Sequence, residues 1–194
     1  MDDSRLLAKP QCVKKEFEMD KIKFVVEEYV DDEAGFRFPT INPYINNRSL
    51  IELVGEIERR RWPPESEGAR QGYVGFQIAA YARFRAEMLG LHGNPISVLL
   101  TCTCTFPECD CITAAISLQS EMVFWSEIQN PVLSSKDPWS RWTAEKTAGW
   151  KPVDYSELGV FVFRRAPYIQ DIDELARNWR IGKWPRDIPP HWSR

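Results

Sequence analysis

The first clear pattern of hydrophobic and polar positions along the chain is that of a strand. Residues 22–30 are mostly β-branched and aromatic, which favours an extended conformation. Acidic residues and Gly35 follow, and they predict a turn into a second strand at 36–38. The first residues are charged and lack a clear period, so we expect 1–20 to be a flexible arm.

The clearest helical pattern starts after Ser49. Apolar residues then recur at helical spacing, at Leu50, Leu53, Val54 and Ile57. Ser49 and Glu52 have the spacing of a capping box, in which each side chain accepts the free backbone N–H of the other residue. The arginines at 59–61 suit the carboxyl end of the helix dipole, and Trp62-Pro63-Pro64 ends the helix. The arginine run is therefore explained by the helix and is not interpreted as a nucleic-acid surface.

Further elements follow toward the C-terminus. A second helix is predicted at 76–89 from apolar residues at every fourth position, and Gly90 is suited to end it in a left-handed conformation. Short strands bounded by turn residues are predicted after it, at 96–104, 109–118, 122–128 and 160–163. A closing helix has Pro167 in its first turn and an apolar face made of Tyr168, Ile172, Leu175, Ala176 and Trp179.

The order of these elements predicts the fold class. Strands grouped in the middle with helices around them are typical of an α+β fold, here a single domain at 21–180 with a mostly antiparallel sheet and three helices. The chain shows no internal repeat and no break in composition. The tail at 181–194 is rich in Pro and Trp, and it has no assigned place in the predicted core.

Composition and charge narrow the classes of function. With 194 residues and 43% hydrophobic residues, the chain has the composition of a folded protein. Its net charge of -3 gives no general attraction to nucleic acid or to an anionic membrane surface, so neither is expected as a partner. No apolar run approaches the ~20 residues that span a bilayer, and the acidic start is unlike a secretory signal. We therefore expect a cytoplasmic protein.

The chain has only two histidines, His92 and His191, and this count limits the enzymatic classes. A Ser/His/Asp or Cys/His system would have to use one of them. Multi-histidine metal sites, such as a three-His zinc site or an iron site with two histidines and one carboxylate, are effectively excluded. His92 lies between glycines and is interpreted as a turn residue. No glycine-rich loop ends in Lys followed by Ser or Thr, which argues against nucleotide hydrolysis. We expect no catalytic residues.

Four cysteines form the one cluster with candidate chemistry: Cys102, Cys104, Cys109 and Cys111. Alternate residues of a strand share a face, so a turn at 105–108 would set Cys104 opposite Cys109 and Cys102 opposite Cys111. Three interpretations stay open: a zinc site with four thiolates, one or two disulfides, or small buried hydrophobes. The cofactor prediction is accordingly none or zinc.

Four motifs stand in a fixed order within residues 45–178. They are Asn-x-Arg before Leu-Ile-x-Leu-Val (Asn47, Arg48, Leu50, Ile51, Leu53, Val54), the cysteine hairpin (Cys102, Cys104, Cys109), a Val-x-Trp strand ending in Pro (Val123, Trp125, Ile128, Pro131) and Tyr-Ser-x-Leu-Gly-x-Phe-x-Phe (Tyr155, Ser156, Leu158, Gly159, Phe161, Phe163). In these the chain resembles an uncharacterised family of small bacterial proteins. The resemblance implies a common fold and no mechanism. The family reads Cys-Trp-Pro where this chain reads Cys109-Asp110-Cys111, so the resemblance does not extend to Cys111.

The sequence is best explained as that of a non-enzymatic protein that binds another protein. The most specific version is an immunity-type protein, which neutralises a toxin by occluding its active site, since an acidic surface steers a binder toward a basic partner. The first candidate contact is the densest acidic run, Glu27, Glu28, Asp31, Asp32 and Glu33. The second candidate is the pair of tail tryptophans, Trp184 and Trp192.

Alternatives stay open for both surfaces and for the function. The acidic run has the ordinary interpretation of a solvated strand end and turn, and the tail that of a strap over the core. A zinc- or thiol-dependent protein that uses the cysteine hairpin is the competing function. The third possibility is a bacterial protein of unknown function whose cysteines are purely structural.

Overall fold

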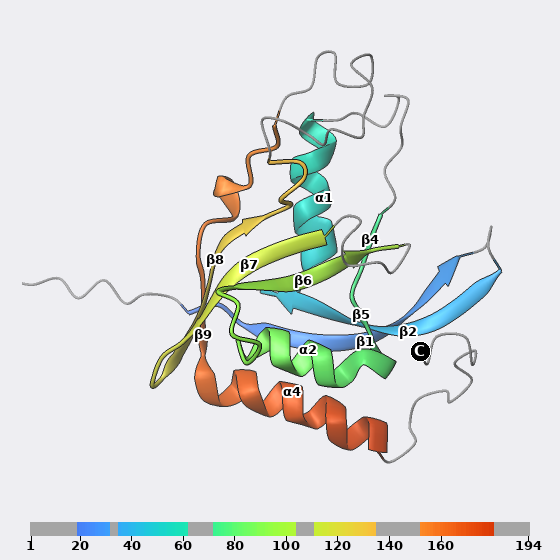
Figure 1. The fold of residues 1–194 in the computed structure, drawn as a ribbon, viewed down its shortest axis with the longest axis vertical. Helices are drawn as coiled ribbons and strands as arrows, with labels where there is room; N and C mark the ends of the chain where they lie inside the picture. Colours follow the sequence, from blue (N-terminus) through green and yellow to red (C-terminus); the bar gives the residue numbers. More distant parts are fainter. Residues whose placement is uncertain (1–18, 32–34, 62–71, 104–110, 135–151, 181–194) are drawn as a thin grey trace, which may run out of the picture.

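The computed structural model describes residues 19–31, 35–61, 72–103, 111–134 and 152–180. Within these ranges, three α-helices and two mostly antiparallel sheets form an α+β fold, which confirms the predicted class (Figure 1). The predicted arm lies outside the described residues except for Met19 and Asp20, and the tail at 181–194 lies wholly outside them.

Two sheets replace the single sheet that the sequence predicts. One sheet contains β1 (Ile22–Asp31), β2 (Phe36–Ile45), β3 (Arg48–Ser49) and β5 (Phe76–Gln77), with β1 and β2 paired along their whole length. The other has the strand order β4 (Tyr73–Val74), β6 (Ile96–Cys102), β7 (Cys111–Leu118), β8 (Met122–Gln129) and β9 (Phe161–Arg164).

The helices largely follow the predicted boundaries. They are α1 (Leu50–Arg61), α2 (Tyr81–Met88) and α4 (Arg165–Arg180), with short 3-10 turns at Ile78–Ala80 and Ser156–Leu158. The Ser49 hydroxyl caps α1 by accepting the backbone N–H of Ile51 at 3.2 Å, one residue earlier than a capping box requires. None of the helices that the structure describes is long and apolar enough to cross a membrane.

The predicted helix at 76–89 is wrong in its first part. Phe76 lies in β5, where its backbone pairs with Ile41 of β2, and regular α-helix begins only at Tyr81. Phe76 and Phe84 are both buried, so the apolar spacing is real, but a strand and a helix share it. Gly90 ends α2 at a φ of 59°, as predicted.

The two sheets are joined at both ends. Residues 73–77 pair with β6 through β4 and with β2 through β5. At the other end, Asp20 forms a parallel bridge to Phe163 of β9. The Asp20 N–H donates to the Val162 carbonyl at 2.8 Å, and the Asp20 carboxylate accepts the Val162 N–H at 2.9 Å. Backbone pairing therefore runs in a closed ring around the core.

One glycine makes the first of these junctions possible. A Cβ at Gly75 would lie 2.0 Å from the Ile41 carbonyl oxygen and 2.3 Å from Oδ1 of Asn42. Asn42 is buried, and its Oδ1 has no hydrogen-bond partner among the described residues, because it lies against the Gly75 backbone. The segment turns from one sheet into the other only because no side chain stands at this position.

An aromatic cluster fills the space between the sheets and the helices α2 and α4. Phe24 makes edge-on contacts with Phe84 of α2 and Tyr168 of α4, at centroid distances of 5.2 and 5.6 Å. Trp125 of β8 packs on Phe163 at 5.3 Å. The Trp125 indole N–H donates to the Tyr168 hydroxyl at 3.2 Å, and that hydroxyl donates to the Met88 carbonyl at 2.8 Å. The cluster therefore buries large rings with their polar atoms satisfied.

The Gly75 junction predicts the outcome of a methyl addition. We expect Gly75→Ala to lower the free energy of unfolding by more than about 2 kcal/mol, because backbone atoms of β2 would have to move. Gly72→Ala is the matched control, since its Cβ would meet only Cγ2 of Thr103, at an ordinary 3.6 Å. Urea unfolding of both variants measures the difference, and equal midpoints for the two would contradict this account of the junction.

Candidate functional site

The acidic run at the end of β1 is divided between two faces of the hairpin. Consecutive strand residues point to opposite faces, which separates Glu27 from Glu28. The Glu27 carboxylate accepts hydrogen bonds from Nδ2 of Asn42 and the hydroxyl of Tyr44, each at 2.6 Å. The Glu28 side chain is 57% exposed and lies 4.0 Å from Arg37.

The predicted contact of five acids therefore needs correction. Glu27 belongs to the packing of the hairpin itself, because two polar side chains of β2 hold its carboxylate. Glu28 is exposed and Asp31 is half-buried at the strand end. Asp32 and Glu33 lie outside the described residues, as do the tail tryptophans Trp184 and Trp192. Of the candidate acids, Glu28 is the one that the described hairpin exposes most fully.

Tyr44 responds to the carboxylate beside it. Its hydrogen bond to Glu27, together with burial, raises the pKa of Tyr44 from 10.0 to about 12. A tyrosine with a raised pKa keeps its proton in the folded protein after the unfolded chain has released it. The free energy of unfolding therefore falls as the pH rises through this interval.

We expect this fall to be measurable between pH 10 and about 12. Tyr44→Phe removes the titrating group, so its free energy of unfolding should fall less steeply over that interval than that of the native chain. Burial also raises the pKa of Tyr168, and this contribution is common to both proteins. Denaturant titrations at several alkaline pH values compare the two slopes. Parallel slopes would contradict the assigned pKa.

A second polar cluster lies buried where α1 ends. The Glu58 carboxylate accepts the hydroxyl of Tyr73 at 2.7 Å and that of Tyr155 at 2.5 Å. The amide of Asn130 donates to the Tyr73 hydroxyl at 2.6 Å and its oxygen accepts the backbone N–H of Val132 at 2.9 Å. All four polar side chains are less than 10% exposed. The cluster links α1 to β4, to the end of β8 and to the Ser156–Leu158 turn.

The sequence contains a local signal for this cluster in the position of Glu58. Glu58 stands four residues after Val54 and eight after Leu50, so it continues the buried face of α1. An acid at such a position requires polar partners in the core, because a buried carboxylate without hydrogen bonds is strongly unfavourable. The partners come from distant segments, and Tyr155 is 97 residues away.

The burial of Glu58 predicts how much its tyrosines contribute to stability. Tyr155→Phe should lower the free energy of unfolding by about 2 kcal/mol, since it removes a buried hydrogen bond to a charged acceptor. Tyr44→Phe is the matched control, because its hydrogen bond to Glu27 has nearly the same length, 2.6 Å, but is only partly buried. We expect a loss of about 1 kcal/mol for the control at neutral pH. A smaller loss for Tyr155→Phe than for the control would contradict this reading.

A third cluster brings Glu87, His92 and Ser97 together after α2. Nε2 of His92 lies 2.8 Å from the Glu87 carboxylate and 3.3 Å from the Ser97 hydroxyl. Nδ1 of His92 accepts the backbone N–H of Asn94, so the ring proton belongs on Nε2. The Ser97 hydroxyl donates to the Glu87 carbonyl at 2.8 Å.

These connections differ from those of a nucleophile triad. In a triad the acid and the serine bind different ring nitrogens, so that the histidine can take the proton of the serine. Here both contact Nε2, and that nitrogen carries a proton for the carboxylate. Glu87 also accepts the backbone N–H of Val98 at 2.9 Å. The cluster therefore fastens the turn after α2 to β6, which agrees with the prediction that His92 is a turn residue.

The cysteine hairpin has a different register from the one expected. Cys111 pairs with Thr101, and Cys102 pairs with Tyr73 on the other side of β6. Since neighbours in a strand point to opposite faces, Cys102 and Cys111 do not share a face. The predicted pairing of Cys102 with Cys111 is therefore wrong, because the β6–β7 ladder next to the turn is offset by one residue from the register that the prediction assumed.

The remaining cysteine predictions depend on residues that the structure does not describe. Cys104 and Cys109 lie within 104–110. Across the described ranges, no group of three or more His, Cys, Asp or Glu side chains is arranged to hold a metal ion. Zinc binding by the hairpin stays a prediction.

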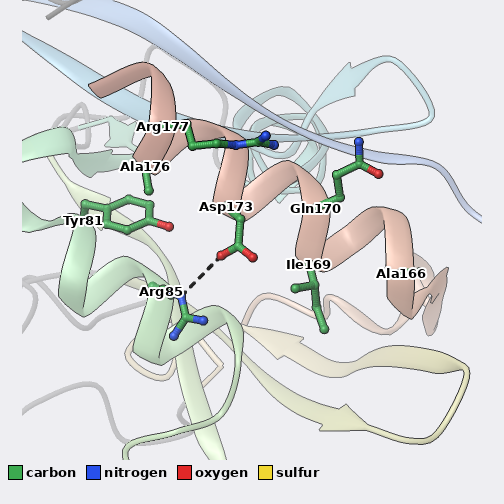
Figure 2. A pocket seen from close by; sticks show the side chains of 8 residues that line it. All are labelled: Tyr81, Arg85, Ala166, Ile169, Gln170, Asp173, Ala176 and Arg177. Atoms are coloured by element: carbon green, nitrogen blue, oxygen red, sulfur yellow. Dashed lines mark ion pairs between the residues drawn. The ribbon is translucent and has the colours of Figure 1, made fainter. Parts of the chain in front are cut away.

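An open groove of about 770 Å³ lies between α2 and α4 (Figure 2). Arg85 and Asp173 reach toward each other across it, with Nε and Oδ1 3.6 Å apart. Arg177 has Glu174 at 3.5 Å. Tyr81 and Ile169 line the groove between these polar groups. Both arginines thus lie beside carboxylates of α4, so the side chains around the groove carry both positive and negative charge.

No protein-family model, curated protein or solved structure matches the chain. The resemblance to small bacterial proteins that the four motifs indicate therefore stays a prediction.

Proposed function

We propose that this chain is a non-enzymatic cytoplasmic protein that binds a basic protein partner, and that it neutralises this partner in the manner of an immunity protein. The outer end of the β1–β2 hairpin carries the proposal. There Glu28 has a side chain that is 57% exposed, and Val30 is 38% exposed. An exposed apolar side chain next to an exposed acid suits a protein interface better than a small-molecule pocket.

The position of the hairpin supports the same function. In Figure 1 the outer ends of β1 and β2, in blue, project beyond α2 and α4 at the right side of the view. A projecting strand pair is accessible to a large partner. Its acidic side chains raise the rate at which a basic partner is encountered, and salt weakens that effect.

The buried acids support a non-enzymatic assignment. Glu58 accepts two tyrosine hydroxyls, and Glu87 contacts His92 and the Val98 backbone. Both carboxylates are thus engaged by groups of the protein itself and link separate elements of the fold. Such contacts are expected of polar groups that stabilise a fold.

A charge reversal on the hairpin tests the proposal. We expect the tagged full chain to capture a basic protein from a lysate of its native host in a stoichiometric complex. Glu28→Lys should slow association with that protein about tenfold at low salt. Glu121→Lys is the matched control, since Glu121 is an exposed acid in the turn between β7 and β8. Surface plasmon resonance with the purified partner gives the rate constants.

Two results would contradict the proposal. One is the recovery of the full chain without a stoichiometric partner. The other is a partner whose association is slowed equally by the substitutions at Glu28 and at Glu121.

A further inference from the structure

The backbone of β1 presents alternate residues to its outer edge. In an antiparallel pair, residues alternate between those that bond the neighbouring strand and those whose N–H and C=O point away from it. The Lys21 carbonyl accepts the Asn46 N–H, which marks odd-numbered residues as the inward set. The Asp20 and Phe24 N–H groups donate outward, to the Val162 carbonyl and to Oδ2 of Asp171. The same alternation makes Val26, Glu28 and Val30 outward residues.

The covered part of this edge ends early in the strand. Asp20 bridges to β9, and Asp171 of α4 accepts the Phe24 N–H. Within the described ranges, β1 has β2 as its only paired strand, and Asp20 makes the only bridge on its other side. From half-buried Val26 to exposed Glu28 and Val30, the edge therefore presents backbone donors and acceptors in the geometry that a further strand requires.

The two edges of the hairpin are protected differently. The β2 residue opposite Glu28 is Pro39, whose nitrogen points to the outer edge of β2 and cannot donate a hydrogen bond. Proline at an exposed edge is a common device against strand addition. The β1 edge has no proline from Ile22 to Asp31. The hairpin thus blocks one edge and leaves the other competent to pair.

Charge disfavours a second copy of the chain as the occupant of the β1 edge. Antiparallel pairing of two such edges around Glu28 would place Glu28 opposite Glu28, with Glu27 and Asp31 of each strand near acids of the other. Like charges directly across a strand pair are destabilising. A strand with basic side chains would instead be attracted to these acids, because opposite charges across a strand pair are stabilising.

We infer that the outer edge of β1, at Val26, Glu28 and Val30, is a docking site for an extended, basic segment of a partner protein, which adds to the sheet as a further strand. The inference rests on the proposed function and specifies how the partner is held. Main-chain hydrogen bonds to the edge provide affinity, and the exposed carboxylate of Glu28 selects basic side chains.

A synthetic peptide tests this mode of binding directly. The probe is a nine-residue peptide of alternating Lys and Val, added to the full chain labelled with 15N. We expect amide hydrogen exchange at Val26, Glu28 and Val30 to slow at least about tenfold in the presence of the peptide, because these amides gain acceptors. The same peptide with Glu in place of Lys, or with Pro as its central residue, should give no protection.

Two substitutions at one position separate the backbone from the charge. Glu28→Pro removes the outward N–H without removing a hydrogen bond to β2, and it should weaken peptide binding about tenfold more than Glu28→Gln, which keeps the N–H. The 15N spectrum of each variant shows whether it is folded. Val30→Pro, which also removes an outward donor, takes the place of Glu28→Pro if that variant is unfolded.

Several outcomes overturn the inference. Slow exchange of the three amides in the protein alone would mean that another part of the chain or a second copy already pairs with this edge. Peptide binding that leaves these amides unprotected would also overturn the inference. So would an equal peptide affinity of Glu28→Pro and Glu28→Gln. If the captured partner is lost with Glu28→Lys but retained with Glu28→Pro, strand addition is wrong and the proposed function stands. If no partner is captured, the proposed function fails, and the peptide result alone decides the edge.

Discussion

The contact between Trp125 and Tyr168 fixes how the elements of this fold are placed. Trp125 belongs to β8 and Tyr168 to α4, and the Tyr168 hydroxyl continues the hydrogen-bond chain to the end of α2. Phe24 of β1 packs on both rings. One set of buried side chains therefore connects both sheets and two helices. The hairpin, the turn after α2 and the edge of β1 take their positions from it.

The hairpin shows how a structural requirement and a binding surface coexist in one strand. Its inner half contributes Phe24 to the core and is joined to β9 and α4, whereas its outer half has exposed Glu28 and Val30. Glu27, between these two parts, supports the hairpin from the opposite face by binding Asn42 and Tyr44. Neighbouring acids in one sequence run thus have different roles because the strand alternates its faces.

The sequence predicted those strands and helices whose boundaries are marked by residues within the element or next to it. The strand before Gly35, the helix after Ser49 and the helix containing Pro167 all have sequence signals within a few residues, and the structure contains each of them. Phe76 shows where this approach fails. Its spacing to Phe84 fits one helix, but its backbone pairs with Ile41, and no pattern around residue 76 contains information about residue 41.

The clusters were harder to predict, for a related reason. The contacts of Glu27 and Glu58 depend on register and on packing between segments that lie far apart in the chain. A shift of one residue in the β6–β7 ladder was enough to separate Cys102 from Cys111. The count of histidines limited the possible catalytic sites more than any motif did, because His92 is one of only two candidates for a catalytic histidine. In the structure the contacts of His92 are those of a turn residue.

The closure of the strand ring by Asp20 and Phe24 has a consequence for the synthesis of the protein. Phe24 and its acceptor Asp171 are separated by 147 residues, so the hairpin leaves the ribosome long before α4 does. At ordinary rates of translation this interval is on the order of ten seconds. Until α4 is made, Phe24 lacks Tyr168 as a packing partner, and the edge of β1 lacks Asp171 and β9. The outer acids keep two such nascent chains apart through like charge, which protects the protein before its core exists.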